Sequence, residues 1–370
     1  MYRHAIGAGL LAVAGLLAAC GSHQAPPPAA QRSLNLYNWS NYIDPTVLAD
    51  FERQTGIHIR LATYPNQESM QAVLLTGQSQ YDVVVVSSDV LEYLSGAHAF
   101  RELDRAQLPD WGNLDAAMLE RLTAQDPGHR YGVPYLWGTT GLSLNITRIA
   151  QVAPRMPVDS WTLLFDPANA AQVARCGIFV NDEPNEVTDS ALLFLGKEAN
   201  SAAPADLDQA GELLMRIRRH VGKIEGEGQI NDLASGEMCA EITSTSVMVQ
   251  AKRRARETGG TAELRYVIPR EGAIMFIDTL AIPVDAPHPA EAHAFINFLL
   301  RGDVAARNAN LTGGASPNRA AFTAIEPWIR DDPAIYPPPE VQRKLQLMRA
   351  RSPESSRIVT RNWTRFKTGR

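Results

Sequence analysis

Hydrophobic and polar positions in the first third of the chain follow two different periods. Leu34 and Leu36 alternate with polar neighbours, as do residues 57–61, so both segments are predicted as strands. Residues 83–86 are four consecutive valines, which is typical of a strand buried on both faces of a parallel sheet. Apolar residues recur at helical spacing between these strands. The resulting order predicts the start of a doubly wound α/β fold.

Aromatic and small polar residues follow the first predicted strand, from Tyr37 to Asp44. In an open α/β sheet, ligands bind just beyond the carboxyl ends of the strands. Aromatic faces attract cations by roughly 0.5 to 2 kcal/mol. Trp39 and Tyr42 therefore either face a cationic ligand or are ordinary packing residues.

Three carboxylates each allow a structural and a functional interpretation. Asp89 follows the valine strand, where it either caps the next helix or contacts a ligand. Glu186 lies at a predicted helix start, where it either complements the helix dipole or faces a ligand. Asp278 lies within the long apolar run 272–283, and an unpaired buried charge is costly. Its partner is either an arginine of the fold or a cationic ligand.

A second series of predicted strands and helices begins near residue 142 and indicates a second α/β unit. Cys176 and Cys239 lie in two of its predicted strands. In an exported protein such a pair is a disulfide candidate, and two buried free thiols are the alternative. No spacing of histidines or cysteines supports a metal site.

The 370 residues are long enough for two domains with substantial cores. The composition, 45% hydrophobic and 20% charged, is that of a soluble protein. A net charge of -5 argues against a nucleic-acid partner.

The N-terminus is predicted to be a targeting segment. The apolar run 5–17 follows a short positive region and is too short to span a bilayer as a mature helix. It ends in residues 17–20, Leu-Ala-Ala-Cys, which resemble a bacterial lipobox. This resemblance implies a signal peptide at 1–19 and lipid on Cys20. The Pro- and Ala-rich composition predicts an extended tether at 20–33. A plain secretory signal is the alternative.

Ordered blocks from about residue 33 to the C-terminus resemble the periplasmic polyamine-binding proteins of ABC importers, most of all the putrescine-binding branch. The blocks are Leu36 to Ile43, Asp82 to Ser87, Pro134 to Gly141, Pro157 to Trp161, Ile230 to Ala234, Gly272 to Pro283 and Ile335 to Pro338.

The resemblance implies an α/β fold of two lobes, a type II-like periplasmic-binding-protein fold with the ligand cleft between the lobes. Hinge strands would cross between the lobes near Thr140 and Met275. The implied first lobe comprises 34–140 plus 275–325, and the second comprises 141–274 plus 326–370.

The resemblance also implies that the protein captures a small cationic amine and delivers it to an ABC permease. It implies no catalysis and no cofactor. We expect a monomer in the periplasm, anchored to a membrane through Cys20.

Site residues can be assigned from the resemblance position by position. Carboxylates would pair with ligand ammonium groups, and aromatic rings would flank the alkyl chain. The implied ligand-binding residues are Trp39, Ser40, Asn41, Tyr42, Ser87, Glu186, Ser244, Phe276 and Asp278.

The chain departs from the family pattern at several of these positions. The family has acids where this chain has Asn41 and Val247, and a tryptophan where it has Ser244. A family tyrosine is replaced near Gly314. A charge-assisted hydrogen bond contributes roughly 1.5 to 3 kcal/mol, so losing two acids would weaken diamine binding.

Three alternatives to putrescine uptake follow. The ligand could be a bulkier or less charged amine, or the protein could sense a ligand without transporting it. A hydrolase could use paired carboxylates such as Glu183 and Glu186, although the sequence has no nucleophile-elbow or metal motif.

Overall fold

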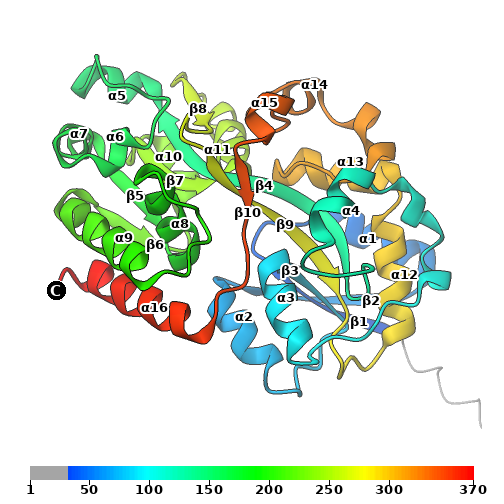
Figure 1. Ribbon diagram of the computed structural model, residues 1–370. Coiled ribbons are helices and arrows are strands. Elements are labelled where there is room, and N and C mark those ends of the chain that lie inside the picture. The colour runs from blue at the N-terminus through cyan, green and yellow to red at the C-terminus, as the bar shows by residue number, and fades with distance from the viewer. Residues whose placement is uncertain (1–31) are drawn as a thin grey trace, which may run out of the picture. The chain divides into compact units, whose positions relative to one another are not determined.

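The computed structural model describes residues 32–370, which form a mixed α/β fold of two lobes (Figure 1). The predicted signal peptide, Cys20 and nearly all of the predicted tether lie outside the described residues. Within 32–370, no helix is both long and apolar enough to cross a membrane.

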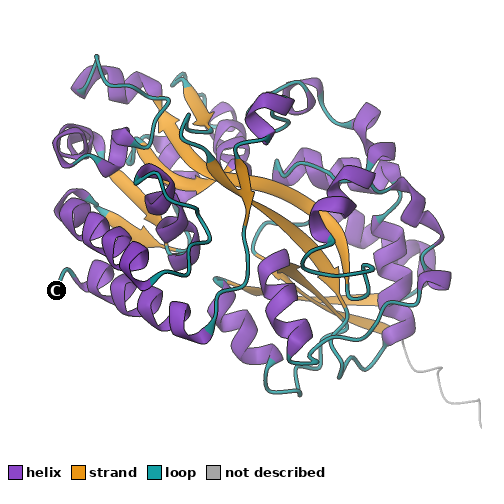
Figure 2. Cartoon of the chain, in the orientation of Figure 1, coloured by secondary structure: helices purple, strands orange, loops and turns teal. Residues whose placement is uncertain are grey.

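The described strands join in one sheet (Figure 2). They are β1 (Ser33–Trp39), β2 (His58–Tyr64), β3 (Val83–Ser87), β4 (Gly132–Asn145), β5 (Ile178–Asn181), β6 (Lys223–Glu225), β7 (Ala240–Ser244), β8 (Leu264–Val267), β9 (Ala273–Ala281) and β10 (Leu345–Leu347).

Helices cover both faces of this sheet. Those of the first lobe and its C-terminal additions are α1 (Pro45–Thr55), α2 (Gln67–Leu74), α3 (Ser88–Gly96), α4 (Ala116–Leu122), α12 (Pro289–Leu299), α13 (Gly302–Thr312), α14 (Pro327–Arg330) and α15 (Pro339–Gln342). The others are α5 (Ile146–Val152), α6 (Thr162–Phe165), α7 (Pro167–Val173), α8 (Pro184–Phe194), α9 (Pro204–Ile217), α10 (Gln229–Ser235), α11 (Thr245–Glu257) and α16 (Pro353–Thr368).

The strand order is β2-β1-β3-β9-β4-β7-β5-β6, with β8 beside β4 and β10 beside β9. β1, β2 and β3 are parallel, and so are β5, β6 and β7. β4 and β9 run antiparallel to each other between these two parallel sets. The first part of β4 pairs with β9 and its last part pairs with β7 and β8, so this strand passes from one lobe to the other (Figure 1).

The valine strand β3 shows why the first lobe has helices on both faces. Val83 and Val85 belong to one hydrophobic cluster, with residues of α1 and α12, whereas Val84 and Val86 belong to another, with residues of α2 and α3. Full burial of one such side chain contributes about 1.5 to 3 kcal/mol. The predicted doubly buried strand is therefore confirmed.

Capping residues mark both ends of the first helix. Asp44 accepts a 2.7 Å hydrogen bond from the Thr46 amide, and Pro45 occupies the first turn. Gly56 ends the helix with φ at 69°, a conformation that favours glycine. The Asp44 cap fixes where α1 begins, directly after the turn that carries Ser40 and Asn41.

In the second lobe, Cys176 and Cys239 form a disulfide with a Cα–Cα distance of 5.6 Å. It joins the turn before β5 to the residue that precedes β7, two neighbouring parallel strands. The predicted disulfide is thus present, and the alternative of two free thiols is not.

The C-terminal region combines helices with a strand. A short strand, β10, pairs with β9 between α15 and α16. Ile329 and Ile335 pack in the hydrophobic cluster of the first lobe, whereas Trp363 and Phe366 pack in that of the second lobe. This packing differs from the assignment of all of 326–370 to the second lobe, and the lobe limits stay a prediction.

Candidate functional site

A cavity of ≈ 150 Å³ lies where β1, β3, β5 and β7 end and where α8 begins, with β9 in its wall. Ligand sites are expected at this position in α/β sheets. The residues that line it are Trp39, Ser40, Tyr42, Tyr64, Pro65, Gln67, Ser87, Asn181, Glu183, Glu186, Gly226, Glu227, Gln229, Ile230, Ser244, Ser246, Val247, Gln250, Phe276 and Asp278.

The structure brings together all the predicted ligand-binding residues except Asn41. Asn41 is exposed in the turn after β1, with φ at 57°. Asparagine tolerates this left-handed conformation better than most residues. Asn41 therefore lies in the turn and not in the cavity wall, so an uncharged side chain at this position does not change the wall itself.

Asp278 is the carboxylate of the β9 wall. It is buried, with 4% of its surface exposed, and accepts a 2.6 Å hydrogen bond from the Tyr42 hydroxyl. Burial raises the pKa of Asp278 to about 7, and the Tyr42 hydrogen bond acts against this rise. The partner is a neutral phenol rather than the arginine that the sequence left open, so a negative charge here stays available to a cation.

Tyr42 is held in place from its other side. The Tyr135 hydroxyl donates a 2.8 Å hydrogen bond to the Tyr42 carbonyl, and the two rings meet edge to face. Both rings also belong to the core of the first lobe. The packing interpretation of Tyr42 is therefore confirmed, and because the residue also lines the cavity, its contact with a ligand stays a prediction.

Two further carboxylates stand at the N-terminal end of α8. Glu183 occupies the N-cap position, and Glu186 lies in the first turn. Thr140 of β4 donates a 2.7 Å hydrogen bond to Glu186 Oε2. Burial raises the pKa of Glu186 to about 7, and the Thr140 hydrogen bond lowers it. Burial and the neighbouring Glu186 raise the pKa of Glu183 well above its usual range.

Asp89 lies behind Ser87 rather than capping α3. The N-cap residue is Ser87, so the prediction that Asp89 caps this helix was wrong. The Ser87 hydroxyl donates a 2.6 Å hydrogen bond to Asp89 Oδ1. Asp89 is buried, and its charge raises the pKa values of Asp278 and Glu186. Ser87 lines the cavity, and Asp89 adds negative potential behind it.

Aromatic rings form the apolar part of the wall. Trp39 packs on Tyr64 with ring centroids 4.5 Å apart. Phe276 lies against Gly138, where an added Cβ would come within 2.7 Å of the ring, so a larger residue at 138 would push Phe276 aside. Rings of this kind attract ammonium groups and cover methylene groups.

Two of the departures from the family pattern lie in the wall itself. Ser244 and Val247 both line the cavity, and the Ser244 and Ser246 hydroxyls are 2.8 Å apart. Gly314 is not among the lining residues, and it packs against Leu136. The wall formed by β7 and α11 is therefore uncharged, and apart from Gln250 its side chains are small.

Sequence reasoning did not assign Tyr64, Gln67, Asn181 or Ser246 to the site. Glu183 was noted only as half of a hydrolytic pair. Its position directly before Pro184, at a helix start beside Glu186, was the available signal. Tyr64 ends β2, so the rule that ligands sit beyond strand ends would have found it.

The chemistry of the cavity is that of cation binding. It combines three buried carboxyl groups, hydroxyl groups and aromatic rings. Within residues 32–370, no group of His, Cys, Asp and Glu side chains is arranged to hold a metal ion.

Comparisons with known proteins agree with this description. Residues 46–337 match the family of bacterial extracellular solute-binding proteins. The putrescine-binding periplasmic protein PotF of Escherichia coli is 37% identical over 344 residues, which cover 92% of this chain and 93% of that protein. A putrescine/agmatine-binding protein of Pseudomonas aeruginosa is 38% identical, with 92% and 93% covered.

Among solved structures, the spermidine/putrescine ABC transporter substrate-binding protein PotD of Streptococcus pneumoniae superposes with a TM-score of 0.75. The two chains are 25% identical, and the match covers 91% of this chain and 99% of that chain. The chain belongs to the bacterial extracellular solute-binding protein family. It is the solute-binding protein of a transport system and not an enzyme, which excludes the hydrolase alternative.

Proposed function

We propose that this protein captures a polyamine, most simply putrescine, and delivers it to the permease of an ABC importer. The names of its relatives support a polyamine ligand. The observation that carries the proposal is the joint presence of Asp278, Glu183 and Glu186 in one cavity, on elements from both lobes.

Binding would pair each end of a diamine with a different wall. One ammonium group would meet Asp278 and the Ser87 hydroxyl, and the other would meet Glu183 and Glu186. Trp39 and Phe276 would cover the methylene groups between them. Each charge-assisted hydrogen bond contributes about 1.5 to 3 kcal/mol.

The ligand would also change the protonation of its own site. Burial raises the pKa values of Asp278 and Glu186 to about 7, so these groups hold a proton part of the time in the free protein at neutral pH. An ammonium group favours the ionised carboxylate. Capture of a diamine would therefore release protons near neutral pH.

Each lobe would contribute one end of the site, so ligand binding would draw the lobes together, and the permease would recognise the closed form. We further propose a periplasmic location and attachment to a membrane through lipid on Cys20. The lipid proposal rests on the sequence of residues 17–20 alone.

The test is calorimetry of the purified protein, freed of carried-over ligand by refolding, with putrescine, cadaverine, spermidine and agmatine. We expect saturable binding of at least one amine by the native sequence. Asp278→Asn and Glu186→Gln should each weaken binding about tenfold or more, because each removes a charged acceptor. The control is Glu263→Gln, an exposed acid outside the cavity wall. Equal affinities in all four proteins would contradict the proposal.

A bulkier or less charged amine is a second candidate, favoured by Ser244 and Val247 in the wall. Their small, uncharged side chains leave one side of the cavity without the acid and ring that the resemblance implies. A thermal-shift panel of amines would decide, since the best ligand stabilises most at equal concentration. Strongest stabilisation by putrescine would exclude this candidate.

A further inference from the structure

Residues 345–351, here called the strap, run from β10 toward α16 and contact both lobes. On the first-lobe side, the Gln125 side chain donates a 2.6 Å hydrogen bond to the Met348 carbonyl. Arg349 donates a 2.9 Å hydrogen bond to Glu92 of α3. The strap is thus a third connection between the lobes, beside β4 and β9 (Figure 1).

The strap is bonded to the strand that carries one wall of the site. Leu345 to Leu347 pair in parallel with Ala273 to Met275, and the Met348 amide donates a 2.9 Å hydrogen bond to the Met275 carbonyl. The next residue of β9 is Phe276, and Asp278 follows two positions later. A shift of the strap along β9 would therefore be transmitted to both of these wall residues.

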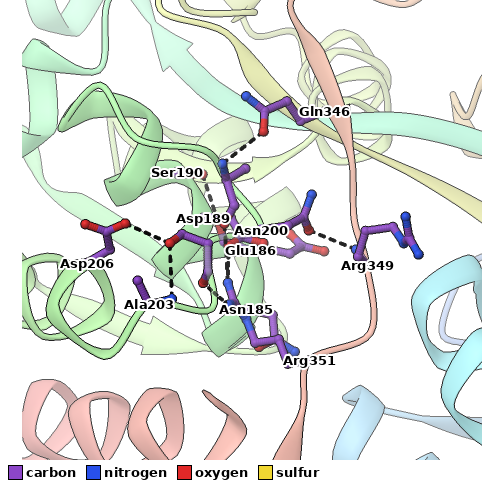
Figure 3. A network of polar contacts seen from close by, with 12 residues as sticks. Asn185, Glu186, Asp189, Ser190, Asn200, Ala203, Asp206, Gln346, Arg349 and Arg351 are labelled. Atoms are coloured by element: carbon purple, nitrogen blue, oxygen red, sulfur yellow. Dashed lines mark hydrogen bonds and ion pairs between the residues drawn. The ribbon is translucent and has the colours of Figure 1, made fainter. Parts of the chain in front are cut away.

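The same segment is bonded to the helix that carries the other wall. Arg351 forms an ion pair with Asp189 of α8 and donates a 3.2 Å hydrogen bond to the Asn185 side chain. Asp189 lies one helical turn after Glu186, and Asn185 directly precedes it. Figure 3 shows Arg351 beside Asn185 and Asp189, with Glu186 on the same helix.

This ion pair is unusual in its burial. The side chains of Arg351 and Asp189 are only 5% and 3% exposed. Arg351 also donates a 3.0 Å hydrogen bond to the Ser201 carbonyl, so its guanidinium has several fixed acceptors. Removal of one partner of such a pair leaves a buried charge uncompensated, whereas removal of both does not. The pair therefore favours one position of α8 relative to the strap.

Three more hydrogen bonds fix the strap to the loop after α8. The Ala199 amide donates to the Gln346 side chain, and the Asn200 side chain donates to the Leu347 carbonyl, each at 2.9 Å. The Arg349 amide donates to the Asn200 side chain at 2.9 Å. Figure 3 shows Gln346, Arg349 and Arg351 following one another along the strap.

We propose that Arg351 is a positioning residue for the ligand site. Through Asp189 it holds the acidic start of α8 to the strap that also pairs with β9. It thereby sets the spacing between Asp278 on one wall and Glu183 and Glu186 on the other. The spacing of these carboxylates determines which length of diamine the site selects, and this inference rests on the proposed function.

The test compares affinities for diamines of increasing length, from 1,3-diaminopropane through putrescine and cadaverine to 1,6-diaminohexane, by calorimetry. The native sequence should prefer one length. Arg351→Met should flatten this preference about tenfold, since α8 is then no longer fixed to the strap. The matched control is Arg349→Met, which removes the same side chain from the same strap but no contact with α8.

Two further variants separate positioning from charge. Arg351→Lys keeps a cation beside Asp189 and should retain most of the length preference. Asp189→Asn combined with Arg351→Met leaves neither charge unpaired, so it should fold even where Arg351→Met alone does not. The proposal expects this double variant to have lost the preference.

A uniform loss of affinity for all lengths in Arg351→Met, or an equal flattening in Arg349→Met, would overturn the inference. So would a full length preference in the double variant. If the native sequence binds no amine, the proposed function fails instead. Hydrogen exchange of the ligand-free protein then decides: faster exchange of the α8 amides in Arg351→Met than in Arg349→Met supports the strap's role, and equal exchange contradicts it.

Discussion

The Tyr42 hydroxyl donates a 2.6 Å hydrogen bond to Asp278, a residue 236 positions further along the chain. This bond lowers the pKa of Asp278 against the effect of burial. It engages only one of the two carboxylate oxygens, Oδ2. The bond therefore prepares Asp278 for a cation without neutralising it.

Removal of this hydrogen bond should weaken ligand binding. In Tyr42→Phe the pKa of Asp278 rises further, and we expect affinity for putrescine at pH 7 to fall about tenfold, equivalent to ~1.4 kcal/mol. The loss should shrink at pH 9, where Asp278 is ionised in both proteins. Calorimetry at the two pH values measures it, with the exposed Tyr93→Phe as control. A loss that is equal at both pH values would show that the hydroxyl acts only by packing.

The stability of the ligand-free protein should fall as pH rises. The pKa values of Asp278 and Glu186 are about 7 in the folded chain, against roughly 4 for unperturbed carboxyl groups. Between these values the folded state binds more protons than the unfolded state, so the free energy of unfolding decreases from about pH 4.5 to pH 7. Denaturant titration should show a smaller decrease in Asp278→Asn and Glu186→Gln than in the native sequence. An identical decrease in all three would contradict the assignment.

The hydrogen bond from Thr140 to Glu186 should also strengthen ligand binding, because it favours the ionised carboxylate as the Tyr42 hydroxyl does at Asp278. Thr140→Val keeps the shape of the side chain but removes the donor 2.7 Å from Glu186 Oε2. The pKa of Glu186 should rise, and putrescine affinity at pH 7 should fall about three- to tenfold. Thr258→Val, on the surface at the end of α11, serves as control. Unchanged affinity at pH 7 would mean that Glu186 does not contact the ligand in its ionised form.

The disulfide should stabilise the second lobe without shaping the site. Cys176 and Cys239 are 63 positions apart, and cross-linking a loop of this length contributes about 4 kcal/mol in the chain-entropy account. Replacement of both by alanine should lower the unfolding midpoint in denaturant while leaving putrescine affinity within about twofold. A large loss of affinity in this variant would show that the bridge also positions α8 or β7.

Local signals predicted most of the first lobe. The valine run of β3 predicted a strand buried on both faces, because the side chains of four consecutive valines point to both sides of the sheet and all need to be covered. Asp44 and Gly56 marked the ends of α1 through their own capping contacts. The N-cap of α3 is Ser87 rather than the predicted Asp89, because three polar residues, Ser87 to Asp89, follow one another and the sequence does not show which of them begins the helix.

Local sequence signals could not predict which strands pair when they lie far apart in the chain. β10 is three residues long, and it is a strand only because β9 offers an unpaired edge there. Leu345, Gln346 and Leu347 do alternate between apolar and polar, but three residues are too few to distinguish a strand from the neighbouring helical segments. The pairing of β10 with β9 brings the strap to α8, where Arg351 meets Asp189. The sequence alone therefore could not predict this ion pair.

The resemblance pointed to residues that line the cavity better than periodicity could, but it did not point to every neighbour that tertiary packing brings there. Asn41 matched a family position and yet lies outside the cavity wall, because the turn after β1 directs it outward. Glu183 and Tyr64 line the cavity and were not predicted to do so, although Glu183 stands at the start of a helix and Tyr64 at the end of a strand.

The most direct test of this account is a calorimetric titration of the ligand-free protein with putrescine, alongside the Asp278→Asn variant, at pH 8. We expect saturable one-to-one binding by the native sequence, and affinity lower by about tenfold to a hundredfold in the variant. No heat from putrescine, cadaverine, spermidine or agmatine with the native sequence, or equal binding by the variant, would contradict it.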